Sequence, residues 1–408
     1  MTVKDFGITK DGIATKLYTL KNNNLEISVT DFGSTLVSIV VPDRNNKPTD
    51  IVLGYDDVSG YETDDGYYFG CNVGRCANRI AKGHFVLNNT EYNLDINNGP
   101  NNLHSGLNPY SKRVWTVENQ NDTSITFSLE SPHMDQGFPG ALKMYVTYEL
   151  LEDGFKINYN ATPDKDTIIN VTNHSYFNLN GEGSGTVLNH SVKIYADSFT
   201  PADETSIPTG EIEAVKDTPM DFNNFKTIGQ DINKDYIPLK YANGYDHNWI
   251  TDPTDSKLHN IVDAVGDVSG IEMKISTNCP GVQMYTANFV ENVKGKKDHI
   301  YNVREAVCFE PQYYPDAINH DNFVSPVCKA GCTYNKDIIY KFYQKKHVST
   351  LFVLLYVDTC FSYCIITVSN LLAKPVLAQI NLCNYLIFLC FTLLHLFEYT
   401  FLFAAFFL

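Results

Sequence analysis

Apolar and polar residues alternate along most of this chain, from Ala14 to about Phe342. A period of two places successive side chains on opposite faces of a β-strand. The alternation runs from Met144 to Leu150, breaks at an Asp-Gly turn, and resumes from Phe155 to Tyr159. This arrangement predicts a β-hairpin.

Two further segments repeat the hairpin pattern. One is His84–Leu94, with an Asn-Asn turn, and the other pairs Arg113–Val117 with Ser124–Leu129. Helical periodicity is nearly absent, so only short helical turns are predicted, near Asp56–Tyr61 and Asn224–Gly229. Many short strands with frequent turns indicate an all-β protein built as one large antiparallel β-sandwich.

The pattern changes abruptly after His347. Residues 347–408 carry only three formal charges, Asp358, Lys374 and Glu398, and are otherwise rich in Leu, Phe, Val, Ile, Tyr and Cys. No linker rich in Gly, Ser or Pro divides the preceding part. We therefore assign residues 1–346 to one β-sandwich domain and residues 347–408 to a hydrophobic tail outside it.

Two interpretations of the tail remain open. Its apolar runs, Leu351–Leu372 and Tyr385–Leu408, are long enough to cross a bilayer, since about 20 apolar residues suffice. Each run carries an acidic residue, which costs roughly 2.5–3.5 kcal/mol on insertion. We favour the interpretation that the tail results from readthrough or a frame error. In the alternative, it is a pair of membrane segments, and the membrane is then a partner.

Composition narrows the possible partners. The 408 residues include 47 acidic and 31 basic ones, for a net charge of -16. Such a surface argues against a nucleic-acid partner, because phosphates are bound by Lys and Arg. The first eleven residues are charged and resemble no signal peptide, so we expect a cytoplasmic protein. Buried free thiols are then expected at four cysteines, namely Cys71, Cys76, Cys279 and Cys308.

Two segments could supply acid–base chemistry. In Asn170–Asn178, His174 lies among polar residues that could orient an imidazole, although a histidine satisfied inside a sheet is the simpler alternative. Glu310 follows an apolar strand and precedes a proline, where burial should raise its pKa and strengthen it as a base. Asp316 is the alternative acid, but its position after Pro315 is typical of a turn. No spacing favours a metal site.

Other polar residues could bind a small ligand. Arg79, beside Asn78, could direct its guanidinium at hydroxyl groups, and a structural ion pair is the alternative. His104 lies in a loop next to small residues. In Gly244–Trp249, the group of Asp246, His247 and Trp249 suggests a sugar site, in which an acid accepts hydroxyl hydrogen bonds and rings cover apolar C–H faces. Gln283 adds an amide.

These segments together resemble the aldose 1-epimerase family over roughly Phe6 to Tyr343. The motifs that carry the resemblance occur in the family's order: Asn78–Ile80, Asn101–His104, Thr172–Asn178, Gly244–Asn248, Pro280–Gln283 and Phe309–Glu310. The resemblance implies a β-sandwich of the galactose-mutarotase type. It also implies a cofactor-free interconversion of α- and β-aldoses in hexose and galactose metabolism, with a small-molecule aldose as partner.

The resemblance also implies a role for individual residues. Glu310 matches the family's base and His174 its acid. The residues that match sugar-binding positions are Asn78, Arg79, His104, Asp246 and Gln283. Activity is expected to rise with pH as Glu310 ionises and to fall as His174 loses its proton.

Three departures from the family pattern accompany these matches. Ser105 replaces a more usual glycine after His104, Cys328 and Cys332 replace an aliphatic and an acidic residue, and the tail has no counterpart. Three rival functions remain: a sugar-binding module without turnover, a membrane-associated sugar sensor, and an epimerase for hexose 6-phosphates. The last would need a basic cluster for the phosphate, which the motifs lack.

Overall fold

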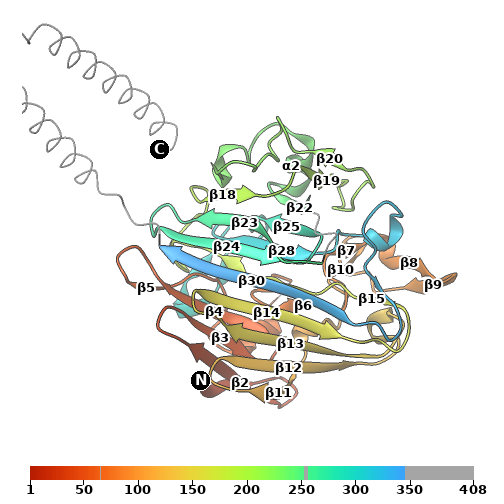
Figure 1. The fold of residues 1–408 in the computed structure, drawn as a ribbon, viewed down its shortest axis with the longest axis horizontal. Helices are drawn as coiled ribbons and strands as arrows, with labels where there is room; N and C mark the ends of the chain where they lie inside the picture. Colours follow the sequence, from red (N-terminus) through yellow and green to blue (C-terminus); the bar gives the residue numbers. More distant parts are fainter. Residues whose placement is uncertain (65, 252–255, 345–408) are drawn as a thin grey trace, which may run out of the picture. The chain divides into compact units, whose positions relative to one another are not determined.

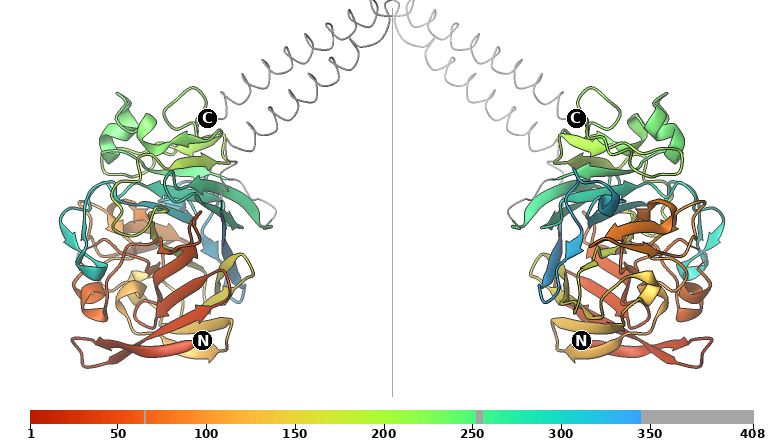
Figure 2. Two further views of the ribbon diagram at one scale, coloured as in Figure 1. Left: turned by 90° about the vertical axis from the view of Figure 1, so that its left-hand side faces the viewer. Right: turned by 90° about the vertical axis from the view of Figure 1, so that its right-hand side faces the viewer.

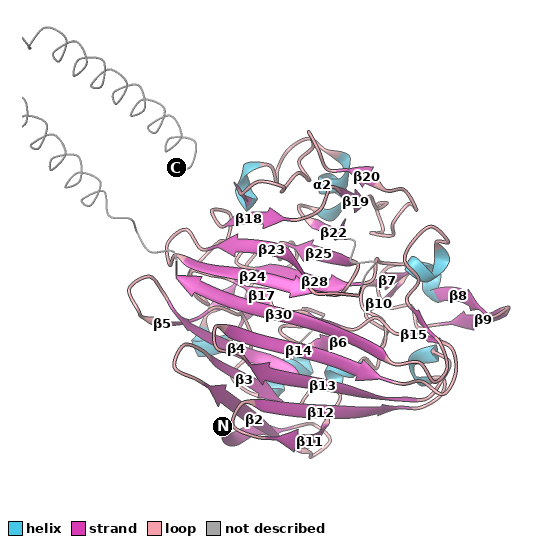
Figure 3. Ribbon diagram, viewed as in Figure 1, coloured by secondary structure: helices cyan, strands magenta, loops and turns pink. Residues whose placement is uncertain are grey.

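The computed structural model describes residues 1–64, 66–251 and 256–344, and its contacts gather Met1–Lys346 into one compact unit. The predicted all-β, antiparallel architecture is confirmed, since strands make up most of the regular secondary structure of the described residues (Figure 3). The two interpretations of the tail concern residues outside the described ones. Within the described ranges, no helix has the length and apolarity needed to cross a bilayer.

The largest sheet has nine antiparallel strands and forms one layer of the sandwich (Figure 1). The predicted central hairpin is confirmed, because Tyr148 pairs with Ile157 across its two strands. The strands lie in the order β11 (Thr116–Gln120), β12 (Ser124–Ser131), β13 (Leu142–Leu150), β14 (Gly154–Ala161), β30 (Tyr334–Gln344), β24 (Ile271–Thr277), β23 (His259–Val265), β18 (Ser191–Ile194) and β21 (Lys226–Thr227).

A six-stranded sheet forms the second layer and carries the candidate chemistry. Its order is β17 (Tyr176–Phe177), β28 (Val307–Gln312), β25 (Gly281–Tyr285), β22 (Asp246–Ile250), β19 (Ser198–Thr200) and β20 (Glu213–Ala214). Phe177 of this sheet contacts Tyr340 of the nine-stranded sheet, with ring centroids 5.5 Å apart. The apolar faces of the two sheets therefore share one core.

The N-terminal strands add a third sheet to the same core. Leu20, Ile27 and Ile39 from this sheet are fully buried in the cluster that also contains Phe177 and Tyr340. Figure 2 shows the red N-terminal strands at one end of the unit and the green segment between β19 and β22 at the other. The sheet consists of β1 (Thr2–Ile8), β2 (Ala14–Lys21), β3 (Glu26–Thr30), β4 (Thr35–Pro42) and β5 (Pro48–Asp50).

Short strand pairs and helical turns connect the sheets. The pairs are β6 (Asn72–Val73) with β16 (Thr172–Asn173), β7 (Arg79–Ile80) with β10 (Asn102–Leu103), β8 (His84–Leu87) with β9 (Thr90–Asn93), β15 (Thr167–Ile168) with β29 (Val327–Cys328), and β26 (Val293–Lys294) with β27 (Ile300–Tyr301). The helices are α1 (Val58–Thr63) and α2 (Ile237–Ala242), and the 3-10 turns are η1 (Ala81–Gly83), η2 (Tyr110–Lys112), η3 (Asp135–Gly137), η4 (Ile228–Gln230), η5 (Lys296–Asp298) and η6 (Ala317–Asn319).

Most differences from the sequence prediction lie at the ends of elements. The first predicted helical turn is α1, and the second is the 3-10 turn η4. Helix α2 is not predicted, because its six residues are too few to show a helical period. Strand β11 begins at Thr116 rather than Arg113, whose guanidinium instead binds Asp135. The four cysteines expected to be buried free thiols are confirmed as such.

We propose that residues 1–346 are an independent folding domain, and a fragment ending at Lys346 should therefore fold alone. Its last described strand, β30, is paired on both edges, with β14 and β24. We expect soluble expression and one cooperative transition in thermal unfolding followed by near-UV circular dichroism. An insoluble fragment, alongside a soluble full-length chain, would show that the tail belongs to the fold.

Candidate active site

The six-stranded sheet has one apolar and one polar face. Directly paired residues lie on the same face, so Glu310, Gln283 and Asn248 form a row across β28, β25 and β22. Their sequence neighbours Phe309, Met284 and Trp249 point into the core and are fully buried.

This alternation corrects the predicted sugar site of Asp246, His247 and Trp249. Asp246 lies on the polar face, whereas the next residue, His247, and Trp249 lie on the apolar face. The indole Nε1 of Trp249 donates to the carbonyl of Met220 at 3.0 Å, so the ring is part of the core. Only Asp246 of the three is available to a ligand.

A cavity of about 610 Å³ opens over the polar face. Six of the seven predicted site residues line it, namely Asn78, Arg79, His104, His174, Asp246 and Glu310. The seventh, Gln283, lies behind Asp246, to whose Oδ1 its Nε2 donates at 2.6 Å. The topology thus gathers motifs that are more than 200 residues apart in the chain.

Glu310 and His174 are adjacent in the cavity wall. Glu310 Oε1 lies 3.6 Å from His174 Nε2, and the exposed fractions of these side chains are only 2% and 7%. Burial raises the pKa of Glu310 well above its ordinary value, the charge of Asp246 raises it further, and Arg79 lowers it. Burial also lowers the pKa of His174 to about 4, although Asp246 opposes this shift. The expected rise in the Glu310 pKa is confirmed.

Rings rather than the neighbouring polar side chains position the imidazole of His174. It stacks on Tyr176 with ring centroids 5.1 Å apart and on Tyr68 at 6.1 Å. Asn173 instead binds the carbonyl of Gly70, and Ser175 binds Asn173. The polar residues of the motif therefore fix the backbone around His174, which differs from the sequence expectation.

Arg79 and Asp246 face each other across the cavity wall. Arg79 Nη1 lies 3.9 Å from Asp246 Oδ2, and Arg79 Nε donates to Asn98 Oδ1 at 3.1 Å. Gln283 holds the other oxygen of the same carboxylate. Asn98 and Gln283 therefore orient a charged pair that remains loose enough to bind hydroxyl groups.

His104 is held in one tautomer. The ring Nδ1 of His104 accepts a hydrogen bond from the Asn78 backbone N–H at 3.1 Å, and the backbone N–H of His104 donates to the Asn78 carbonyl at 3.0 Å. Burial lowers the pKa of His104 well below its ordinary value, and His174 and Arg79 lower it further. A neutral ring with an occupied Nδ1 carries its proton on Nε2, so His104 can donate to a ligand oxygen.

Strained backbone surrounds the cavity. Tyr68, Asn78, His104 and Ser105 all have positive φ, between 51° and 72°. Side chains other than glycine rarely adopt this region, and such residues are typical of functional sites. The serine at 105 keeps the conformation that favours the usual glycine, and its Oγ binds both the N–H and the carbonyl of Cys76.

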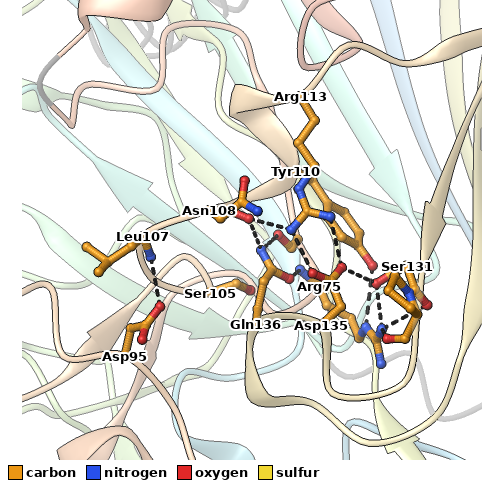
Figure 4. A network of polar contacts seen from close by, with 12 residues as sticks. Arg75, Asp95, Ser105, Leu107, Asn108, Tyr110, Arg113, Ser131, Asp135 and Gln136 are labelled. Carbon is orange, nitrogen blue, oxygen red and sulfur yellow. Dashed lines mark hydrogen bonds and ion pairs between the residues drawn. The ribbon is translucent and has the colours of Figure 1, made fainter.

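A polar network ties together the loops that carry these residues (Figure 4). Gln136 Oε1 accepts from the backbone N–H of Arg75, and its Nε2 donates to the carbonyls of Gly74 and Asn108. Arg113 and Asp135 add an ion pair at 2.8 Å. The loops before Asn78 and after His104 are thereby held against a third loop.

Asp316, the alternative base, lies outside the residues that line the cavity. Its Oδ1 accepts from the backbone N–H of Ala81 at 2.9 Å and from Asn319 Nδ2 at 2.7 Å. These contacts fix the turn that follows β28. Over the described ranges, no group of three His, Cys, Asp or Glu side chains has an arrangement that could hold a metal ion.

Known proteins are similar to this chain in sequence and in fold. The family model for aldose 1-epimerase matches residues 16–341.

The chain belongs to the aldose 1-epimerase family.

Galactose mutarotase from Bos taurus is 38% identical and covers 80% of this chain and 93% of its own length. Aldose 1-epimerase from Escherichia coli is 33% identical, with 82% and 97% covered. The solved structure of an aldose epimerase homologue from C. elegans superimposes with a TM-score of 0.75 at 32% identity, over 81% of this chain and 99% of that one.

Several residues that line the cavity are not predicted from the sequence. Tyr68, Asn98, Tyr241, Tyr285 and Phe289 line it, although only the motif residues were expected to do so. Tyr241 and Phe289 are about half exposed, at 49% and 58%, so they form the rim. An aromatic residue that lines a cavity resembles any other aromatic residue in the sequence, and no spacing marks these five.

Ser105 offers a test of the loop strain. Ser105→Ala removes both hydrogen bonds to Cys76 and keeps the unfavourable φ, so it should lower the free energy of unfolding by about 1–3 kcal/mol. Ser105→Gly also loses the bonds but relieves the backbone, and should be about 1–2 kcal/mol more stable than the alanine variant. Urea denaturation measures both. Equal stability of the two variants would contradict the role of φ.

Proposed function

We propose that this chain interconverts the α- and β-anomers of aldohexoses such as D-galactose and D-glucose, with Glu310 as the base and His174 as the acid. Membership of the aldose 1-epimerase family makes it an isomerase that acts on carbohydrates. The observation that supports the two roles is the buried Glu310–His174 pair at 3.6 Å on the wall of the cavity. We expect no cofactor.

The proposed reaction needs one proton taken and one proton given. Glu310 accepts the proton of the anomeric hydroxyl, the bond from C1 to the ring oxygen breaks, and His174 gives its proton to that oxygen. The aldehyde then rotates about C1–C2 and closes from either face, with the two residues exchanging roles. Both oxygens are bonded to C1, so adjacent side chains can reach them. Each proton transfer contributes roughly 10²–10⁴-fold.

The directions of the pKa shifts decide which protonation state is productive. The pKa of His174 is about 4, and that of Glu310 is raised well above its ordinary value. At a pH between these two pKa values the pair therefore holds one proton, mainly on Glu310. The productive form has this proton on His174. Its population falls about tenfold for each unit that separates the two pKa values.

The remaining residues would bind the sugar hydroxyls. Arg79 and the Nε2–H of His104 donate, Asp246 accepts, Asn78 holds His104, and Gln283 orients Asp246. Tyr68, Tyr176 and Tyr285 supply apolar surface for the C–H faces of a pyranose ring; all three line the cavity.

The charges of the cavity favour a neutral sugar over a hexose 6-phosphate. Of the described residues that line it, Arg79 is the only Lys or Arg, whereas Glu204, Asp246 and Glu310 are acidic. A phosphate would meet more negative than positive charge there. This observation supports unphosphorylated aldoses as the substrate class.

Activity should have a bell-shaped dependence on pH. The rising limb should report His174 and the falling limb Glu310, which is the reverse of the assignment expected from the sequence. Below about pH 4 both groups are protonated, so activity should rise as His174 loses its proton. At high pH it should fall as Glu310 loses the last proton of the pair, above its ordinary pKa. Polarimetry of α-glucose and α-galactose, corrected for the uncatalysed rate, measures kcat/KM. A rise centred well above pH 5 would contradict the shifted order.

Glu310→Gln tests the proposed function most directly. It keeps the shape of the side chain but removes the base, so kcat should fall by at least roughly 10²-fold with KM little changed. His174→Asn should behave alike. Because both groups act in one step, the double variant should be little worse than either single one. Near-normal kcat in Glu310→Gln, or losses that multiply in the double variant, would refute the pairing.

A further inference from the structure

The polar face of the six-stranded sheet continues beyond the sugar cavity. Glu310, Gln283 and Asn248 are directly paired across three strands, and Gln312 follows Glu310 by two residues on the same face of β28. We call these four residues the polar quartet. None is more than 3% exposed. Only Glu310 of the four lines the cavity.

The hydrogen bonds of the quartet are incomplete. Gln283 Nε2 donates to Asp246, and Asn248 Nδ2 donates to Thr200 Oγ1 at 3.3 Å. Within the described part of the chain, no side-chain or backbone partner binds the remaining polar atoms, which are Glu310 Oε2, Gln283 Oε1, Asn248 Oδ1, Gln312 Oε1 and Gln312 Nε2.

These five atoms cannot satisfy one another. In the productive form, in which Glu310 is ionised, four of them are oxygens that only accept, and one amide nitrogen donates. Because acceptors outnumber donors, a small molecule that donates two hydrogen bonds would satisfy these atoms. Water has this chemistry, and buried waters typically bind polar groups that the protein leaves unpaired.

Gly281 opens the space between the two outer amides. It pairs with Gln312, and a Cβ at this position would lie 2.5 Å from Asn248 Oδ1 and 2.9 Å from the ring of Tyr314. The Asn248 oxygen therefore lies over bare backbone, and no side chain at 281 separates it from Gln312. Any other residue there would displace Asn248.

We propose that bound water links the polar quartet into one hydrogen-bonded network, and that Gln312 is a positioning residue which acts on Glu310 through this network. The inference rests on the proposed role of Glu310 as the base. The network would hold the carboxylate of Glu310 in one orientation and solvate its charge from within the sheet face. It adds Gln312 and Asn248 to the residues that affect proton transfer.

The network is one of several influences on the ionisation of Glu310. The charged and titratable groups that interact electrostatically with it are His174, Asp246, Arg79, Cys308, Tyr176 and Tyr340. An apolar residue at 312 leaves these unchanged and removes polar solvation, which favours the neutral carboxyl. The fraction of the protein that has the proton on His174 then falls about tenfold for each unit by which the pKa of Glu310 rises.

Gln312→Leu tests the proposal through a relation between two measured quantities. The falling limb of the kcat/KM profile should move to higher pH by about one unit, and the plateau should fall by about tenfold, the factor that corresponds to that shift. KM should change less than kcat. Met284→Leu, a substitution of similar volume on the apolar face of β25, is the control and should leave the profile unchanged.

Three outcomes would overturn the proposal. If the Gln312→Leu variant folds and its pH profile is normal, Gln312 has no influence on Glu310. The same conclusion holds if the plateau falls but the falling limb does not shift. A crystal structure of the unsubstituted protein without water within about 3.2 Å of Gln312 Nε2 and Asn248 Oδ1 removes the network, whatever the variant does. If Glu310→Gln is inactive while Gln312→Leu is normal, only this inference fails. Near-normal activity of Glu310→Gln would instead remove the proposed base itself.

Discussion

The placement of a carboxylate in a buried row of a β-sheet is the constraint on which the rest of the site depends. Glu310 lies in β28 and pairs directly with Gln283 of β25, so the ladder fixes its backbone, and its side chain is almost fully buried at the cavity wall. The charged form of a buried acid is unfavourable unless other groups compensate for the lost hydration. The charge of Arg79 favours the ionised form of Glu310, and we propose that protonated His174 and the water-linked amides beside Glu310 add to this compensation.

The site divides its tasks between two kinds of structure. The six-stranded sheet supplies Glu310, Asp246 and Gln283, whose relative positions follow from strand register. Loops supply His104, Tyr68 and Phe289, and the first two of these residues have positive φ. The sheet therefore fixes the proposed base Glu310 and the Asp246–Gln283 pair with little freedom, while the loops can vary in their fit to hydroxyl groups and rings.

Much of the fold could be predicted from the sequence because strand periodicity is a local property. The hairpin of β13 and β14 follows from alternating residues and an Asp-Gly turn, and the structure has the same turn. Helix α2 could not be predicted, because six residues do not establish a period and its position depends on packing against β22. The start of β11 is predicted at Arg113 rather than at Thr116, because the ion pair of Arg113 with Asp135 joins two loops that are separate in the chain.

The sequence by itself determined the chemistry of the site. Six of the seven residues that the sequence motifs predict do line the cavity, although several of its aromatic residues are not predicted. Tertiary structure alone decided which face of a strand each residue occupies, and thus why Asp246 is in the site while His247 and Trp249 are in the core. It also decided the order in which Glu310 and His174 titrate. Both depend on burial and on neighbours from distant segments, which no local pattern in the chain records.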